Sequence, residues 1–187
     1  MSDAGGHDGE GALDGAPARL RALLLEGGGL MATLVNATTV CAQASEPARI
    51  AASGPRTACA RDEYELLVEA IYEGYLLHYG APRVVRIPED DLSLLAGDQL
   101  YAIGLARLVA LGDTFAVAEL ADTISLSALA QGAGALELAG AVWLAGAHAV
   151  GWGPSELHTH AKELVLAGAP SAIEAMRTSI QAGATPS

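Results

Sequence analysis

The chain has few basic residues and few cysteines, and each shortage narrows the functions that fit it. It contains 10 Lys and Arg against 22 Asp and Glu, for a formal net charge of −12 at pH 7. Nucleic-acid backbones and anionic membrane surfaces attract clustered Lys and Arg, so this balance argues against both as partners. Two cysteines, Cys41 and Cys59, are too few for a disulfide scaffold, and we expect two buried thiols in a reducing cytoplasm.

Long uninterrupted apolar segments are also missing. The segments 92–112 and 133–153 approach the length that spans a bilayer, but charged or titratable residues interrupt both, as Asp98 and Arg107 do in the first. Because isolated charges are costly in lipid, we expect buried bundle helices and no transmembrane segment. The start of the chain is acidic and glycine-rich, unlike a secretory signal.

The residues that are abundant favour helices. The sequence is 51% hydrophobic and rich in Ala and Leu, which lose little side-chain entropy in a helix. We therefore predict an all-α fold, a single helical bundle over residues 17–182. A disordered acidic and glycine-rich tail over 1–16 precedes it, and a flexible C-terminus over 183–187 follows. The predicted helices cover 18–26, 30–44, 61–79, a segment from after Pro88 to Leu111, 114–130, 136–150 and 155–167, followed by a last short helix after Ser171.

Local signals refine this prediction. Residues 45–57 carry two prolines and polar residues, so we expect a loop there. Asp113 and Ser155 stand where helices begin and are predicted N-caps. In the helix over 61–79, an apolar stripe recurs at helical spacing and is expected to face the core. Its members are Tyr64, Leu67, Ile71, Tyr75 and His78.

Several titratable residues are candidates for a site. Glu65, Glu69 and Glu73 follow one another at intervals of four along the same helix, which predicts a solvated acidic stripe. His158 and His160 lack an acidic or cysteine partner nearby and are expected on the surface. Asp98 lies in a largely apolar helix, and a buried carboxylate needs partners, so we expect it to hydrogen-bond a neighbouring helix end.

Between Glu69 and Asp98 the chain keeps a set of residues at a defined spacing: Gly80, Pro82, Val84 and then Leu95-Ala96-Gly97-Asp98. This segment resembles the first catalytic region of the trans-isoprenyl diphosphate synthase (polyprenyl synthetase) family. That region reads Asp-Asp-x-x-Asp, four residues, Arg-Arg-Gly-x-Pro-x-Val and, further on, Leu-Ala-Gly-Asp. The family's aspartate positions hold Glu69, Ala70 and Glu73 here, and its two arginine positions hold His78 and Tyr79.

The resemblance extends over about residues 24–150 and loses the family's charged groups throughout. Glu26-Gly27-Gly28 is similar to the family's Gly-Gly-Lys-Arg-x-Arg-Pro entrance, but the positions that would hold its basic residues lie among Gly29, Leu30, Ala32 and Thr33. A second Asp-Asp-x-x-Asp is absent. The family's reaction holds pyrophosphate with Mg²⁺ ions between two aspartate clusters and with basic side chains. The resemblance therefore implies a short, degenerate and truncated member.

What the resemblance implies for function is a pseudoenzyme. We expect a non-catalytic polyprenyl-synthetase-like protein without a cofactor, acting as a partner or regulatory subunit in isoprenoid diphosphate metabolism. Because family members generally pair through helices in their first half, we expect a homo-oligomer or a heterodimer with an active isoprenyl synthase.

Two alternatives stay open. One is a remodelled prenyltransferase that acts through Glu69, Glu73 and His78, with Mg²⁺ held by the two glutamates. The other is a helical scaffold or a carrier of an apolar ligand, with a remnant of the family's apolar tunnel. The residues that line such a remnant would be Leu92, Leu95, Tyr101, Ile103 and Leu105.

Overall fold

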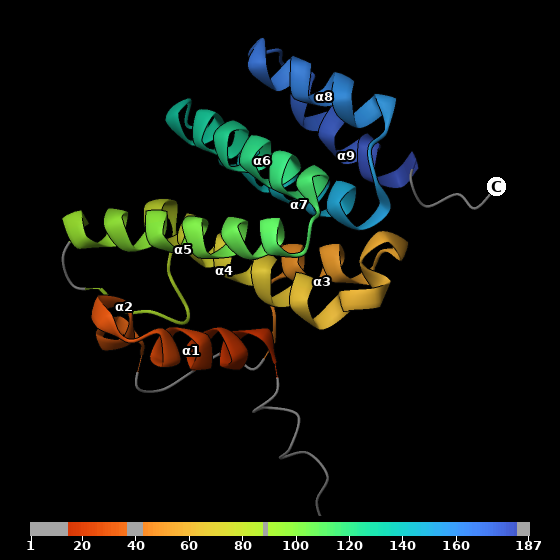
Figure 1. The fold of residues 1–187 in the computed structure, drawn as a ribbon. Coiled ribbons are helices and arrows are strands. Elements are labelled where there is room, and N and C mark those ends of the chain that lie inside the picture. The colour runs from red at the N-terminus through yellow and green to blue at the C-terminus, as the bar shows by residue number, and fades with distance from the viewer. Residues whose placement is uncertain (1–14, 37–42, 88–89, 183–187) are drawn as a thin grey trace, which may run out of the picture.

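Helix α4, Arg61–Tyr79, lies near the centre of the fold and spans the residues predicted for it. The computed structural model describes residues 15–36, 43–87 and 90–182. Within those ranges the fold is all-α, as predicted, and its helices stack in successive pairs from α1 and α2 at one end to α8 and α9 at the other (Figure 1). The other elements are α1 (Ala16–Gly27), α2 (Gly29–Leu34), α3 (Glu46–Ser53), η1 (Pro55–Ala60), α5 (Asp90–Ala110), α6 (Thr114–Gly132), α7 (Leu136–Trp152), α8 (Glu156–Leu166) and α9 (Ala172–Ala182).

Two predictions in the first third of the chain are wrong. The helix expected over 30–44 ends at Leu34, because Val35 is extended and forms an isolated antiparallel bridge with Val85. The segment 45–57, expected as a loop, contains α3 and the 3₁₀ helix η1. Ser45 accepts a hydrogen bond from the Ala48 N–H at 3.3 Å, and Pro47 lies in the first turn. The proline and the polar residues therefore mark a helix start.

Later boundaries agree with the prediction to within about two residues. Both predicted N-caps are confirmed: the Asp113 carboxylate accepts from the Ala116 N–H at 3.0 Å, and Ser155 accepts from the His158 N–H at 3.1 Å. At the N-terminus, α1 begins at Ala16, which is buried, so this helix starts inside the predicted tail over 1–16. Residues 1–14 of that tail and the C-terminal segment 183–187 lie outside the described residues.

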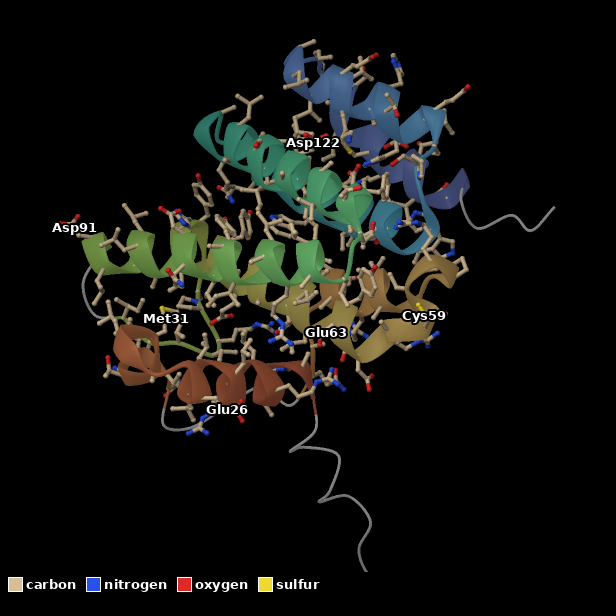
Figure 2. All side chains as sticks on the ribbon, viewed as in Figure 1. Glu26, Met31, Cys59, Glu63, Asp91 and Asp122 are labelled. Atoms are coloured by element: carbon tan, nitrogen blue, oxygen red, sulfur yellow. The ribbon has the colours of Figure 1, made fainter. Side chains whose placement is uncertain are left out.

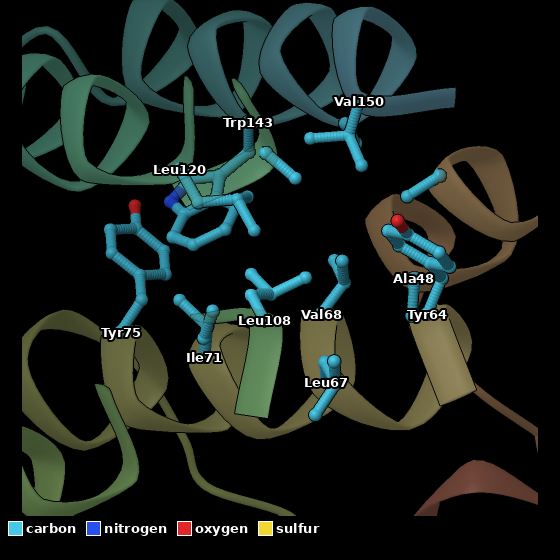
Figure 3. Close-up of a cluster of buried hydrophobic side chains, with 13 residues drawn as sticks. Ala48, Tyr64, Leu67, Val68, Ile71, Tyr75, Leu108, Leu120, Trp143 and Val150 are labelled. Carbon is cyan, nitrogen blue, oxygen red and sulfur yellow. The ribbon is translucent and has the colours of Figure 1, made fainter. Parts of the chain in front are cut away.

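The main hydrophobic core lies between α4 and α7 (Figure 3). Four residues of the predicted stripe on α4 are buried in it, which confirms that face of the helix; they are Tyr64, Leu67, Ile71 and Tyr75. Trp143 and Val150 enter the same core from α7. A second cluster joins α1 to α4 and α5, and a third joins α6 and α7 to α8 and α9.

Glycines allow α4 and α5 to approach closely. A Cβ added to Gly74 of α4 would lie 2.9 Å from the carbonyl oxygen of Gly97 in α5, closer than such atoms come in proteins. A Cβ on Gly97 would in turn collide with the His78 ring. Gly97 belongs to the Leu-Ala-Gly-Asp run, so at least this member of the run has a packing role.

One side of α5 faces away from the rest of the molecule. Leu95 is 65% exposed and Val109 is 59% exposed, although both stand in a strongly apolar helix. Among the described residues, one segment, Asp91–Ala110, is long and apolar enough to cross a membrane by length and composition alone, and 28% of its most apolar window is buried.

The expectation of two buried thiols is wrong for Cys59. This residue lies in η1 with an exposed, unpaired thiol on the surface (Figure 2). The 3₁₀ turn packs through Thr57, which is buried, and the position two residues later points outward. Cys41 lies outside the described residues.

Candidate functional site

Glu69 and Glu73, the two candidate metal ligands, lie one turn apart on α4 and are both 0% exposed. The prediction of a solvated acidic stripe is therefore wrong for these two residues. The prediction considered helix α4 alone. In the structure Gly80 ends α4, and residues 81–87 fold back over the helix and cover both carboxylates. Glu65 lies nearer the surface and pairs with Arg19 at 2.8 Å.

The returning segment supplies partners for both carboxylates. The Glu73 Oε1 accepts from the backbone N–H groups of Arg83 at 2.7 Å, Val84 at 2.6 Å and Val85 at 3.2 Å. Glu69 forms an ion pair with the Arg83 guanidinium through Oε1 and accepts from the Ser45 N–H through Oε2 at 2.7 Å. We call this arrangement of Glu69, Glu73, Arg83 and Ser45 the carboxylate clasp. It ties α4 to the start of α3 and to the 81–87 segment.

Burial dominates the pKa of Glu73, the carboxyl group of the clasp that accepts the backbone N–H groups. Burial raises the pKa of Glu73, and its backbone hydrogen bonds and the Arg83 charge only partly offset that effect. The Arg83 Nε lies 3.9 Å from Glu73 Oε2, which has no hydrogen-bond partner among the described residues.

The clasp does not fit a magnesium ion. Mg²⁺ needs several hard oxygen ligands in octahedral geometry. Three of the four carboxylate oxygens already accept hydrogen bonds, and the fourth lies beside the positive guanidinium of Arg83. A cation would have to displace these donors and approach that positive charge.

The third candidate residue, His78, lies apart from the clasp. Its ring faces α5, where it stacks on Tyr101 with centroids 5.4 Å apart and lies 3.3 Å from the Asp98 carboxylate. The structure therefore does not bring His78 together with Glu69 and Glu73. The expectation of a buried Asp98 is also wrong, because its side chain is 71% exposed on the outer side of α5.

A cavity of about 530 Å³ lies beside the clasp, between α4 and α7. Its aromatic wall is formed by Tyr72, Tyr75 and Trp143, and Arg83 of the clasp also lines it. The remaining wall residues are Ser45, Glu46, Pro47, Leu76, Ala81, Leu136, Gly140 and Leu144. Of these three, the predicted stripe on α4 includes Tyr75 only, and nothing in the sequence indicates that Trp143 meets the two tyrosines from a helix about 70 residues later.

The predicted tunnel residues of α5 do not line this cavity. Tyr101 and Leu105 pack against the main core, Ile103 packs against the second cluster, and Leu95 is exposed. A larger apolar groove of about 820 Å³ lies instead at the far end of α6 and α7, against the turn between α8 and α9. Leu129, Leu136 and Leu166 are exposed along it.

A second buried polar cluster joins α6 to α8 and α9. The His158 Nε2 lies 2.6 Å from the Glu119 Oε1, and Lys162 donates to the other oxygen of Glu119 at 2.9 Å. Burial opposes ionisation of Glu119, but His158 and Lys162 outweigh it and hold the pKa of that carboxyl below its ordinary value. The prediction of a surface His158 is thus wrong, since its partner comes from 39 residues away, whereas His160 is exposed as predicted.

Comparison of the chain with protein-family models, curated proteins and solved structures found no match. The resemblance to the isoprenyl diphosphate synthases therefore stays a prediction that depends on the motifs named above.

Proposed function

We propose that this chain is a non-catalytic helical protein of the polyprenyl-synthetase type that acts as a partner or regulatory subunit in isoprenoid diphosphate metabolism. The observation that supports this proposal is the carboxylate clasp. At the positions of the family's first aspartate cluster, Glu69 and Glu73 are buried and hold backbone N–H groups and Arg83. The same residue types that would hold metal in an enzyme serve here to fix the helical frame.

The outer face of α5 is the surface that we propose for the partner. Leu95, Ala102, Ala106 and Val109 are exposed and recur at the spacing of one helix face. Small residues between two larger apolar ones let a second helix approach closely, as in packed helix pairs. A second copy of this chain or the corresponding helix of an active isoprenyl synthase would cover this face.

A direct assay tests the non-catalytic part of the proposal. The purified chain is incubated with Mg²⁺, isopentenyl diphosphate and allylic diphosphates of several lengths, and pyrophosphate release is measured beside an active synthase. We expect no release above the protein-free control. Release that depends on Mg²⁺ and disappears in Glu69→Gln would instead favour the remodelled prenyltransferase.

A mass measurement tests the partner surface. We expect the chain, alone or mixed with an active isoprenyl synthase, to elute as a dimer in size-exclusion chromatography with light scattering. Val109→Asp places a charge on the α5 face and should abolish pairing, whereas Leu166→Asp, at an exposed position on α8, should not. A monomer under every condition would contradict the proposal.

A second candidate function is a carrier of an apolar ligand, and the cavity between α4 and α7 favours it. Cavities of about 300–1,000 Å³ with mostly apolar walls and a few polar groups are typical of small-molecule sites. This cavity has that size and that composition. Mass spectrometry of the purified protein under native conditions would detect a retained small molecule.

A further inference from the structure

Helix α5 packs on the core with one face and leaves the opposite face open. Leu100 and Leu108 lie on the side that faces the core, and both are 0% exposed. On the other side Leu95 and Val109 are mostly exposed. In Figure 1, α5 runs in front of α4, and none of the described helices covers it in that view. The open face is therefore accessible along most of the helix.

The apolar residues of this face form a line that has the same character at both ends. Leu95, Ala102 and Val109 stand seven residues apart, which places them on one side of the helix. Ala106 lies beside this line and is also exposed. The line thus has a larger apolar side chain at each end and small ones in the middle. A second α5 helix could lie along it in either direction, because apolar residues would meet apolar residues both ways.

The charges on the face favour one of these directions. The Asp98 side chain lies beside the line and is 71% exposed. In a parallel pair in register, the two Asp98 carboxylates would stand at the same height and repel each other. In an antiparallel pair that crosses at Ala102, they are separated by about 12 Å along the helix axis, at 1.5 Å per residue. This distance exceeds the Debye length of about 8 Å at physiological salt, so their repulsion is largely screened.

The antiparallel direction also leaves each Asp98 in contact with water. Its height on the helix corresponds to Ala106 of the second copy, whose side chain is too short to cover the carboxylate. An unpaired carboxylate that is covered by apolar groups would be costly. On its other side Asp98 keeps its contact with His78 of α4 at 3.3 Å. Asp91, at the start of α5 (Figure 2), is separated from its counterpart by a still greater distance.

We propose that two copies of this chain pair antiparallel through their α5 helices, with the two-fold axis passing beside Ala102. This inference rests on the proposed partner surface and names its occupant, a second copy of the chain. Leu95 of each copy lies against Val109 of the other, and Ala102 meets its own counterpart. Each copy contributes the same surface, so the assembly closes at two chains.

Cysteine cross-linking tests the occupant. The background is the Cys41→Ser/Cys59→Ser variant, which leaves the introduced thiol as the only one in the chain. On oxidation in this background, Ala102→Cys should form a disulfide-linked dimer on a non-reducing gel, because the residue lies next to its counterpart at the two-fold axis. Leu166→Cys, at an exposed position on α8, is the matched control and should link only at the level of random collision.

Leu95→Cys and Val109→Cys in the same background test the direction. Each variant alone should stay unlinked, because its counterpart lies about 21 Å away along the helix axis, at 1.5 Å per residue. A mixture of the two, left to exchange subunits and with one variant enlarged by a tag, should give a mixed cross-linked dimer. A parallel pair would give the reverse result, with each variant linked to itself and no mixed product.

Dimer dissociation constants from sedimentation equilibrium provide a second measure. Asp98→Asn should change the constant by less than about threefold, because the two carboxylates stand apart. In a parallel pair the same substitution would remove two facing charges and tighten the dimer by about fivefold or more. Added NaCl should also tighten the pair, since each copy has a net charge of −12, whereas a basic partner on this face would be released by salt.

The contrary outcomes separate this inference from the proposed function. A dimer whose Leu95→Cys variant links to itself would overturn the antiparallel arrangement and retain the α5 surface. A chain that is monomeric alone but pairs with an active isoprenyl synthase would overturn the second copy as occupant and retain the partner function. A dimer in which no α5 cysteine links above the Leu166→Cys control would overturn this inference and the proposed surface together.

Discussion

The His158 imidazole Nε2 lies 2.6 Å from the Glu119 carboxylate, inside the junction between α6 and α8. Partly buried ion pairs stand at two other junctions. Arg83 and Glu69 join the segment after α4 to that helix, and Arg56 and Asp113 join η1 to the start of α6. Helices rich in Ala, Leu and Gly offer few distinctive side chains, so we infer that these directional contacts help to fix how they pack.

Glu119→Gln should lower the free energy of unfolding at pH 7 by about 2 kcal/mol. The variant loses the charge that His158 and Lys162 contact. Hydrogen bonds to charged groups contribute about 1.5–3 kcal/mol each. Urea denaturation followed by circular dichroism measures the change. Glu163→Gln is the matched control: its partner is also a histidine, His160, but its side chain is 70% exposed, and the expected change is below about 0.5 kcal/mol.

The effect of Glu119→Gln should depend on pH in one direction. The folded state lowers the pKa of Glu119, so its contribution to stability is fully present above the ordinary value of 4.5 and is lost as the pH falls through the folded pKa. The gap between wild type and variant should therefore be largest near neutral pH and shrink in acid. A gap that stays constant from pH 7 to pH 3 would contradict the assignment.

Removing the clasp at Glu73 should be more costly than removing an exposed glutamate of the same helix. Glu73→Ala leaves three backbone N–H groups without their acceptor and should reduce the free energy of unfolding by about 3 kcal/mol or more. Glu73→Gln keeps an acceptor oxygen and should cost about 1 kcal/mol. Thermal and urea denaturation measure both changes.

The control for this series is Glu65→Ala, two turns before Glu73. Glu65 is partly exposed, and its ion-pair partner among the described residues is Arg19 of α1, so its removal should cost less than about 1 kcal/mol. Equal destabilisation by Glu65→Ala and Glu73→Ala would show that the three backbone hydrogen bonds at Glu73 contribute little.

The fold was largely predictable because its signals are local. Gly80 at the end of α4, the Asp113 and Ser155 N-caps, and the apolar stripe from Tyr64 to Tyr75 each act within a few residues. The start of α3 was missed because proline and serine indicate a loop and a helix N-terminus equally well. The tertiary bridge between Val35 and Val85 ended α2 early, and no local signal marks it.

The candidate site was predictable only in its position on α4. The spacing of Glu69 and Glu73 correctly places both on one helix face, but burial of that face depends on Arg83 and on Ser45, which approach from both sides in sequence. His158 illustrates the same limit, because its partner Glu119 lies 39 residues earlier. Long-range pairing decides whether a titratable residue is solvated or buried, and periodicity does not carry that information.

The exposed Cys59 gives a chemical test of the surface near η1. Its thiol should react with Ellman's reagent in the folded protein at the rate of an accessible cysteine, because no contact in η1 covers it. In a Cys41→Ser background the fast phase should remain, and adding Cys59→Ser should remove it. A Cys41→Ser protein that shows no fast phase would contradict the described exposure of Cys59.

Gly54 and Gly140 should respond in opposite ways to the same substitution. A Cβ at Gly54 would overlap the backbone of Gly151 where α3 meets α7, so Gly54→Ala should cost about 3 kcal/mol or more through forced movement of the two helices. Gly140 is a helix-interior residue with open space around it, so Gly140→Ala should stabilise by about 0.5–1 kcal/mol. Denaturation midpoints measure both, and destabilisation by Gly140→Ala would mean that the cavity beside α7 is narrower than described.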